Sequence, residues 1–283
     1  MQKLITFILS KTIGLYINIL SYIAPEKASR LAYKFFSEPR DGRLTKESLP
    51  DILKEAEAEI ITFDNFIFQT YIWKGNENKV LLVHGWESNA SRWELFIPYL
   101  KKAGSTIIAV DAPAHGLSSG HEFTIPRYSQ FINRVVQELK PQYMVGHSMG
   151  GATLLHYQSH YPNNIIQKMV VLGAPCDLNT LLHNYAGMLS LNLNVIQLLK
   201  KHFFNHFKIK TSEFSGSIFA SQINIKGLLA HDVKDEVVSF KEGKKIAEAW
   251  PDAEFIVTRG LGHSMHDDKL YSKIYSFLFE SGE

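Results

Sequence analysis

The 283-residue sequence predicts an α/β protein with a mostly parallel sheet of about eight strands and helices on both faces. Three observations predict this fold class. From residue 59 onward, short apolar runs alternate with segments of helical periodicity, as in strands joined by helical crossovers. Only Asp64 and Asn65 separate the first two runs, which favours an antiparallel hairpin at the start. The composition, with 45% hydrophobic and 20% charged residues, is that of a globular protein.

Charge and cysteine content exclude several other classes. The 30 Lys and Arg are nearly balanced by 28 Asp and Glu, giving a formal charge of +2, so we expect no nucleic-acid partner. Cys176 is the single cysteine, which excludes an intramolecular disulfide and a Cys-based zinc cluster. We therefore expect a cytoplasmic location and neither a metal nor another cofactor. The sequence indicates no particular oligomeric state.

Residues 1–57 are predicted to form a helical N-terminal arm. Residues 4–24 are mostly apolar, but polar and small residues recur every three or four positions and would form one narrow stripe on a helix. The stripe consists of Lys3, Thr6, Ser10, Gly14, Asn18 and Ser21. Three interpretations stay open: an amphipathic helix that packs on the domain or associates with a membrane surface through residues 1–24, a membrane anchor, and a signal peptide. Lys11 would be costly at a bilayer centre and opposes the anchor.

Residues 58–283 are predicted to form one α/β domain. Its strands are expected at residues 60–63, 66–73, 80–83, 106–110, 143–145, 169–172, 227–230 and 254–258. Its helices are expected near residues 91–103, 126–139, 148–161, 240–250 and 267–279. Between the sixth and seventh strands, residues 176–217 carry Leu and Phe at helical spacing and predict an insertion of two or three helices.

The sharpest motif is Gly-His-Ser-Met-Gly-Gly at residues 146–151, directly after the fifth predicted strand. A Gly-x-Ser-x-Gly pattern alone is a weak signal, but here the serine lies where a strand is predicted to become a helix. The flanking glycines permit a turn that is too sharp for residues with a Cβ atom. Such a turn would present the hydroxyl of Ser148, with the N-terminus of the next helix directed at a developing anion. Ser148 is therefore the candidate nucleophile.

A serine hydroxyl needs a base and a carboxylate, and two later segments offer them. The segment after the seventh strand contains Asp232 and Asp235, and the segment after the eighth contains His263 and His266. All of these residues follow the carboxyl ends of predicted strands, where open parallel sheets bind their ligands. The chain order is serine, aspartate, histidine.

With these motifs the sequence resembles the α/β-hydrolase superfamily from about residue 79 to the C-terminus. Two earlier segments belong to the resemblance: Val-His-Gly-Trp at residues 83–86, and residues 110–118, which begin Val-Asp-Ala-Pro. The resemblance implies the α/β-hydrolase fold and makes the insertion at about residues 176–217 a helical lid over the site.

The resemblance also implies roles for single residues. Ser148 corresponds to the nucleophile, His263 to the base and Asp235 to the triad carboxylate. The backbone N–H groups of Trp86 and Met149 correspond to the oxyanion hole.

Neighbouring residues receive other interpretations. Asp232 is the alternative carboxylate and could instead hold its turn through bonds to backbone N–H groups. His266 is the alternative base, at the start of the last helix. Asp111 looks structural, and Glu87 and Arg92 are read as surface salt links or substrate contacts. The residues beside the nucleophile and the oxyanion turn are expected to line the substrate pocket: His84, Gly85 and His147.

These roles predict a serine hydrolase that cleaves a carboxylic ester or thioester through an acyl-enzyme on Ser148. The apolar lid favours a small-molecule substrate with a hydrophobic acyl group. The alternatives are other chemistries of this fold (peptidase, acyltransferase or lyase) and a non-catalytic ligand-binding module.

Overall fold

The structure is a computed structural model that describes residues 2–280, without the side chains of residues 2–4 and 6. Lys3 and Thr6 of the predicted polar stripe therefore lie outside the described side chains. The chain forms two compact units. We call Met1–Glu38 with Asp177–Ser215 the helical unit, and Pro39–Cys176 with Gly216–Glu283 the sheet unit.

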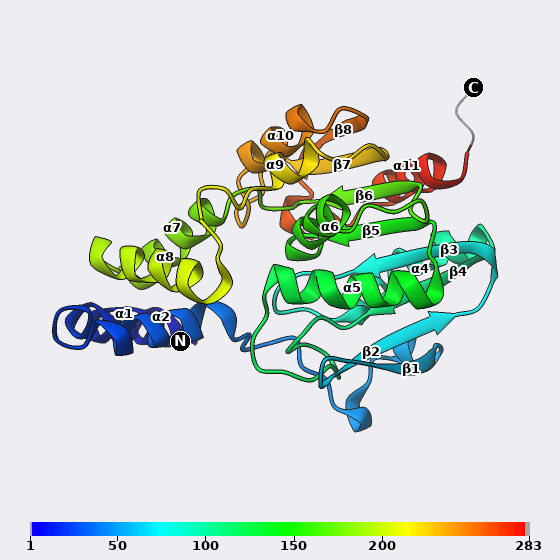
Figure 1. The fold of residues 1–283 in the computed structure, drawn as a ribbon. Coiled ribbons are helices and arrows are strands. Elements are labelled where there is room, and N and C mark those ends of the chain that lie inside the picture. The colour runs from blue at the N-terminus through cyan, green and yellow to red at the C-terminus, as the bar shows by residue number, and fades with distance from the viewer. Residues whose placement is uncertain (1, 281–283) are drawn as a thin grey trace. The chain divides into compact units, whose positions relative to one another are not determined.

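The sheet unit contains one eight-stranded sheet, and every predicted strand is present (Figure 1). The strands are β1 (Glu57–Phe63), β2 (Phe66–Trp73), β3 (Asn76–Val83), β4 (Ser105–Val110), β5 (Tyr143–His147), β6 (Lys168–Leu172), β7 (Lys226–Asp232) and β8 (Ala253–Thr258). Their spatial order is β1-β2-β4-β3-β5-β6-β7-β8. β2 pairs antiparallel with β1 and β4, and all other pairs are parallel. The predicted mostly parallel sheet is confirmed.

Helices cover both faces of this sheet (Figure 1). The longer ones are α4 (Ile97–Lys102), α5 (Ile125–Leu139), α6 (Met149–His160), α10 (Phe240–Ala249) and α11 (Asp268–Phe279). The shorter ones are η1 (Lys46–Ser48), α3 (Asp51–Lys54), η2 (Ala90–Trp93), α9 (Gly216–Ala220) and η3 (Gly262–Ser264). The single helix predicted near residues 91–103 is wrong, because η2 and α4 are separate. Pro98 explains the new start, since its missing N–H needs no acceptor in the first turn of α4.

The parallel strands place the predicted site residues at one edge of the sheet. β3, β5 and β6 end in register, with Val83 opposite Gly146 and His147 opposite Leu172. β7 and β8 continue the same parallel direction to Asp232 and Thr258. The segments that follow these strands therefore emerge together, although they are far apart in the chain.

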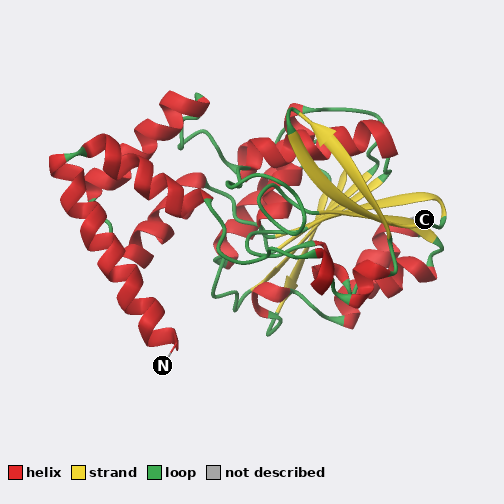
Figure 2. Cartoon of the chain, turned by 90° about the horizontal axis from the view of Figure 1, so that it is seen from below, coloured by secondary structure: helices red, strands yellow, loops and turns green. Residues whose placement is uncertain are grey.

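The helical unit is built from two segments that lie far apart in the chain, the predicted arm and the predicted insertion. Its helices are α1 (Gln2–Ile23), α2 (Pro25–Ser37), α7 (Leu178–Leu189) and α8 (Leu193–Phe207), and no strand of the described chain belongs to it (Figure 2). Ala32 and Tyr33 of α2 share one buried core with Leu182 of α7 and Leu199 of α8. Apolar residues of the arm and of the insertion cover each other in this core, which also includes Ile17 of α1.

Residues 39–57 were assigned to the arm but lie in the sheet unit. Ile52 and Leu53 explain the difference, because both are buried in the sheet core. The insertion at residues 176–217 is helical, and its position as a lid over the site stays a prediction. Among the described residues, no helix combines the length and apolar character required to cross a bilayer.

Candidate active site

The centre of the site is the sharp turn between β5 and α6. Ser148 occupies this turn with φ 54° and ψ −125°, a combination that a residue with a Cβ atom rarely adopts. A backbone hydrogen bond of 2.8 Å from Ser148 N–H to the Leu172 carbonyl of the neighbouring strand holds the turn in place. The conformation separates the side chain of Ser148 from the strand and places it at the N-terminus of α6.

The close approach of α6 to β3 requires glycine. A Cβ on Gly150 would lie 2.2 Å from the Val83 carbonyl oxygen and 2.5 Å from that of His84. A Cβ on Gly85 would likewise lie 2.9 Å from the Cβ of Ser148. The serine turn and the turn after β3 are therefore packed directly against each other.

Gly150→Ala is expected to destabilise the sheet unit by about 1–3 kcal/mol, because the new methyl group overlaps with backbone oxygens that cannot rotate away. Urea unfolding measures the change. Gly187→Ala in α7 is the matched control: a Cβ there has no neighbour within 4 Å, so the helix should gain up to about 1 kcal/mol. Equal stability of wild type and Gly150→Ala would contradict the close packing of the two turns.

A hydrogen-bonded chain connects Ser148 to a histidine and an aspartate. His263 Nε2 lies 2.9 Å from Ser148 Oγ, and His263 Nδ1 lies 2.8 Å from Asp235 Oδ2. Asp235 Oδ1 accepts two backbone N–H groups, from Val237 and Val238, at 2.8 Å each. The structure thus brings together the predicted nucleophile, base and carboxylate from three separate segments.

The environment of Asp235 keeps it ionised. Burial by itself would raise the pKa of this carboxyl group, but hydrogen bonds from His231, His263 and the Val238 N–H outweigh it and hold the pKa well below the usual value. A permanently charged carboxylate beside Nδ1 favours the tautomer of His263 that donates to Asp235. Nε2 of that tautomer is then free of a proton and can accept one from Ser148.

The two alternative residues lie elsewhere. Asp232 accepts the Thr258 hydroxyl and the Leu261 N–H at 2.9 Å each through Oδ2, so it connects β7 to the loop after β8. His266 bonds to the Tyr271 hydroxyl through Nδ1. Neither residue has a hydrogen bond to Ser148 or His263 among the described contacts.

The turn after β3 brings Trp86 next to the serine turn. The tight contact of Gly85 also extends to Met149, whose backbone nitrogen would lie 3.2 Å from a Cβ on Gly85. Trp86 and Met149, which were predicted to supply the two N–H groups of the oxyanion hole, therefore come from two turns that contact each other.

Two buried side chains, those of His84 and Asp111, support the turn after β3 through hydrogen bonds to backbone groups. His84 is fully buried: its Nδ1–H donates to the Gly85 carbonyl at 2.8 Å, and its Nε2 accepts the Ala112 N–H at 2.9 Å. The buried Asp111 accepts the Ala90 N–H at 2.9 Å and the Leu117 N–H at 2.9 Å. Burial raises the pKa of Asp111 to about 6. A direct substrate contact by His84 or Gly85 stays a prediction.

We expect the folded protein to lose stability in acid because His115 is buried without a proton. Its Nε2 accepts the Glu87 N–H at 3.0 Å, and burial lowers its pKa to about 4 despite the Pro113 carbonyl bonded to Nδ1. The unfolded chain, with a histidine pKa of about 6.5, takes up the proton first. The stabilising contribution is therefore complete above about pH 6.5 and is lost as the pH falls toward 4.

Urea unfolding between pH 7 and about pH 4.5 measures this dependence, and His115→Gln should remove on the order of 2 kcal/mol of the decline. His121→Gln at an exposed position is the matched control and should retain the wild-type slope. An unchanged slope in His115→Gln would refute the assignment.

Two further side chains attach the loop that carries His263 to the rest of the site. His147 Nε2–H donates to the His263 carbonyl at 2.7 Å, and Arg92 Nη2–H donates to the Ser264 carbonyl at 2.6 Å. Burial, followed by the charge of Arg92, lowers the pKa of His147 far below its usual value, so the ring is neutral. His147 was predicted to line the substrate pocket, and such a contact stays a prediction.

The contact of Arg92 was not anticipated from the sequence. Burial lowers the pKa of its guanidinium to about 10, and its Nε has no hydrogen-bond partner among the described residues. The expectation of a surface salt link is therefore wrong for Arg92, whereas Glu87 does pair with Arg40 at 3.5 Å. The proximity of Arg92 to the turn after β3 was visible in the sequence, whereas its hydrogen bond to the Ser264 carbonyl joins positions far apart in the chain.

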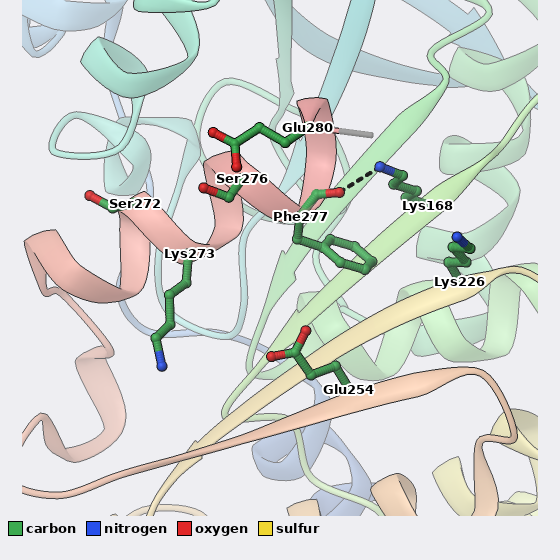
Figure 3. Close-up of a pocket in the computed structure, with 8 residues that line it drawn as sticks. All are labelled: Lys168, Lys226, Glu254, Ser272, Lys273, Ser276, Phe277 and Glu280. Atoms are coloured by element: carbon green, nitrogen blue, oxygen red, sulfur yellow. Dashed lines mark hydrogen bonds between the residues drawn. The ribbon is translucent and has the colours of Figure 1, made fainter. Parts of the chain in front are cut away.

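A separate hollow lies at the opposite edge of the sheet (Figure 3). Its residues come from the beginnings of β6, β7 and β8, from α11 and from the residue after α11: Lys168, Lys226, Glu254, Ser272, Lys273, Ser276, Phe277 and Glu280. Lys168 Nζ donates to the Phe277 and Leu278 carbonyls at 2.6 and 3.0 Å, which fastens the end of α11 to the sheet. The hollow is lined by both lysines and glutamates, and Lys168 is bonded to backbone carbonyls of α11. It is therefore separate in place and in chemistry from the serine, histidine and aspartate at the carboxyl ends of the strands.

Two features define the class of this protein as an α/β hydrolase by fold. One is the strand order of the sheet, and the other is a serine at a strand-to-helix turn that is bonded through a histidine to an aspartate. Comparison with known families agrees: residues 78–244 match the alpha/beta hydrolase fold family. The chain belongs to this family.

Curated relatives resemble part of the chain. A bifunctional esterase/perhydrolase of Acinetobacter calcoaceticus is 32% identical over 97 residues, which are 32% of this chain and 34% of the relative. An esterase of Mycobacterium tuberculosis is 31% identical over 111 residues, 38% of this chain and 36% of the relative. The chain thus matches about a third of the length of these relatives.

A solved bromoperoxidase from Bacillus anthracis has the same fold, with a TM-score of 0.62 and 19% identity over 80% of this chain and 100% of that structure.

Proposed function

We propose that this protein is a serine hydrolase that cleaves a carboxylic ester or thioester through an acyl-enzyme on Ser148. The observation that carries the proposal is the unbroken hydrogen-bonded chain from Ser148 through His263 to Asp235, at 2.9 and 2.8 Å. Two matched relatives are named as esterases, which supports ester chemistry over the other reactions of this fold.

In the proposed reaction, Ser148 Oγ attacks the acyl carbonyl while its proton passes to His263 Nε2. Asp235 stabilises the imidazolium that forms. The backbone N–H groups of Trp86 and Met149 donate to the oxyanion of the tetrahedral intermediate. Removal of one of these donors would destabilise the intermediate by about 3 kcal/mol. The His263 proton then moves to the departing alcohol or thiol as its bond to the acyl carbon breaks.

The second half of the cycle uses the same groups. Water loses a proton to His263 Nε2 and attacks the acyl-enzyme, and the new tetrahedral intermediate collapses when Ser148 Oγ regains a proton. The carboxylic acid leaves and the free serine is restored. The geometry of Ser148, His263 and Asp235 therefore serves acylation and deacylation equally.

Labelling with a fluorophosphonate probe tests the nucleophile. The intact chain should gain one adduct on Ser148, located by mass spectrometry, and Ser148→Ala should gain none. Failure of the wild type to label, or labelling of Ser148→Ala at the same rate, would overturn the proposal.

A series of p-nitrophenyl esters of increasing acyl length tests the substrate class. We expect kcat/KM to rise from acetate toward longer apolar chains, because the apolar residues of the insertion are proposed to favour a hydrophobic acyl group. A thioester of equal acyl length compares the two leaving groups. Adduct formation without turnover of any member would instead support the ligand-binding alternative.

A further inference from the structure

Helix α1 presents apolar side chains to the outside of the helical unit. Ile8, Leu15, Ile19 and Tyr22 are spaced by seven, four and three residues and therefore share one face of the helix. All four are more than half exposed, with 60% exposure at Leu15 and 73% at Tyr22. α1 can be followed from the label N in Figure 2. An apolar face of this length on the outside of a unit indicates an interaction surface.

The opposite face of α1 carries the polar and small residues, and it packs inward. Lys11 Nζ donates to the Met188 carbonyl at 2.9 Å, at the end of α7. Asn18 donates to the Ser190 carbonyl at 2.8 Å and accepts the Asn192 N–H at 2.8 Å. Ile17 is buried on this inward side, and Ile13 and Leu20 pack against the same core, so α1 carries apolar side chains on its inward and on its outward side.

Close packing fixes this orientation. A Cβ on Gly14 would lie 1.7 Å from the Leu189 carbonyl oxygen, so only glycine allows α1 to approach α7 this closely. Ile17, on the same side, is completely buried. Rotating α1 to hide its apolar face would break the bonds of Lys11 and Asn18 and separate the two helices.

We propose that the helical unit docks on an anionic membrane surface through the apolar face of α1. Its two chain segments contain nine Lys and Arg against four Asp and Glu, a formal charge of +5 that leaves −3 for the sheet unit of the +2 chain. Basic charge attracts a unit to anionic lipid, and an apolar face that includes Tyr22 suits the boundary between headgroups and acyl chains.

The same features favour lipid over a second copy of the chain. A symmetric dimer through this face would bring together two helical units of charge +5, whose repulsion opposes association. A membrane instead covers the apolar face and neutralises the charge. The polar face of α1 is occupied by α7 and the residues after it, so the helix lies in the plane of the surface.

Vesicle flotation of the full chain tests the proposal, with phosphatidylcholine vesicles that contain or lack phosphatidylserine. We expect the wild type to float with the anionic vesicles and to be released by high salt. The double variant Leu15→Glu/Ile19→Glu should bind at least about tenfold more weakly, because each change removes the burial of an aliphatic side chain and adds a negative charge.

Ile60→Glu is the matched control, since Ile60 is 61% exposed on β1 of the sheet unit. It should float like the wild type, and circular dichroism should show unchanged folding of every variant. Absence of wild-type binding, equal binding to neutral and anionic vesicles, or equal weakening by Ile60→Glu would overturn the proposal. So would a wild-type dimer that the double variant converts to monomers. Hydrolysis of a soluble ester without vesicles should be the same in the double variant, so membrane docking and the proposed function can fail independently.

Discussion

Ser148→Ala is expected to lower kcat/KM for a soluble p-nitrophenyl ester by roughly 10⁴- to 10⁶-fold, because the proposed reaction loses its nucleophile. The substitution removes one oxygen and its 2.9 Å bond to His263, while alanine preserves the volume of the turn. Initial rates at several substrate concentrations separate kcat from KM. The loss should fall on kcat, because the backbone groups of the oxyanion site stay in place.

Stability provides the control for Ser148→Ala. Its unfolding midpoint should stay close to that of the wild type, which attributes the lost activity to chemistry. Retention of more than about a tenth of the wild-type kcat/KM would exclude Ser148 as the nucleophile.

Asp235→Asn is expected to lower kcat by roughly 10⁴-fold. The neutral amide can present its N–H₂ group to His263 Nδ1, which then favours the tautomer with the proton on Nε2. That tautomer cannot accept the proton of Ser148. The loss should be measured from pH 6 to 9, since the proposed defect is the tautomer and the missing charge, and activity should stay low over this range.

Asp232→Asn is the matched control because Asp232 is an aspartate three residues before Asp235, at the end of β7, and is also buried. It bonds Thr258 and Leu261 and has no hydrogen bond to His263, so its substitution should change kcat less than about tenfold and cost about 1–3 kcal/mol of stability. The opposite pattern, with Asp232→Asn as the inactive variant, would transfer the triad carboxylate to Asp232.

The strands of the sheet unit were predictable because their signals are local. Val80 to Val83 form a continuous apolar run, and such a run suits a strand that is buried on both faces. The turn at Ser148 was equally recognisable, since its glycines stand beside the residue whose backbone is strained. The helix predicted near residues 91–103 was wrong because periodicity alone gave too little weight to the restart at Pro98.

Only the resemblance favoured Asp235 as the carboxylate in the sequence, with Asp232 as the alternative, because the local pattern of charges suits both residues. Asp232 ends β7 and Asp235 follows three residues later, and both accept backbone N–H groups. Only the fold shows that Asp235 contacts His263, 28 residues further along the chain. Arg92 was similarly ambiguous, because its contact with the Ser264 carbonyl spans 172 residues. The charges and spacing of the residues around Asp235 and Arg92 do not indicate that their partners are His263 and Ser264.

Helix α1 shows most clearly what the sequence determines and what the tertiary structure determines. The sequence by itself placed Gly14 and Asn18 on one stripe and the apolar residues on the remaining surface, because the period of an α-helix decides which side chains share a face. Only the tertiary structure decided which face points inward. The bonds of Asn18 to Ser190 and Asn192 connect segments more than 170 residues apart, and such contacts have no trace in local spacing.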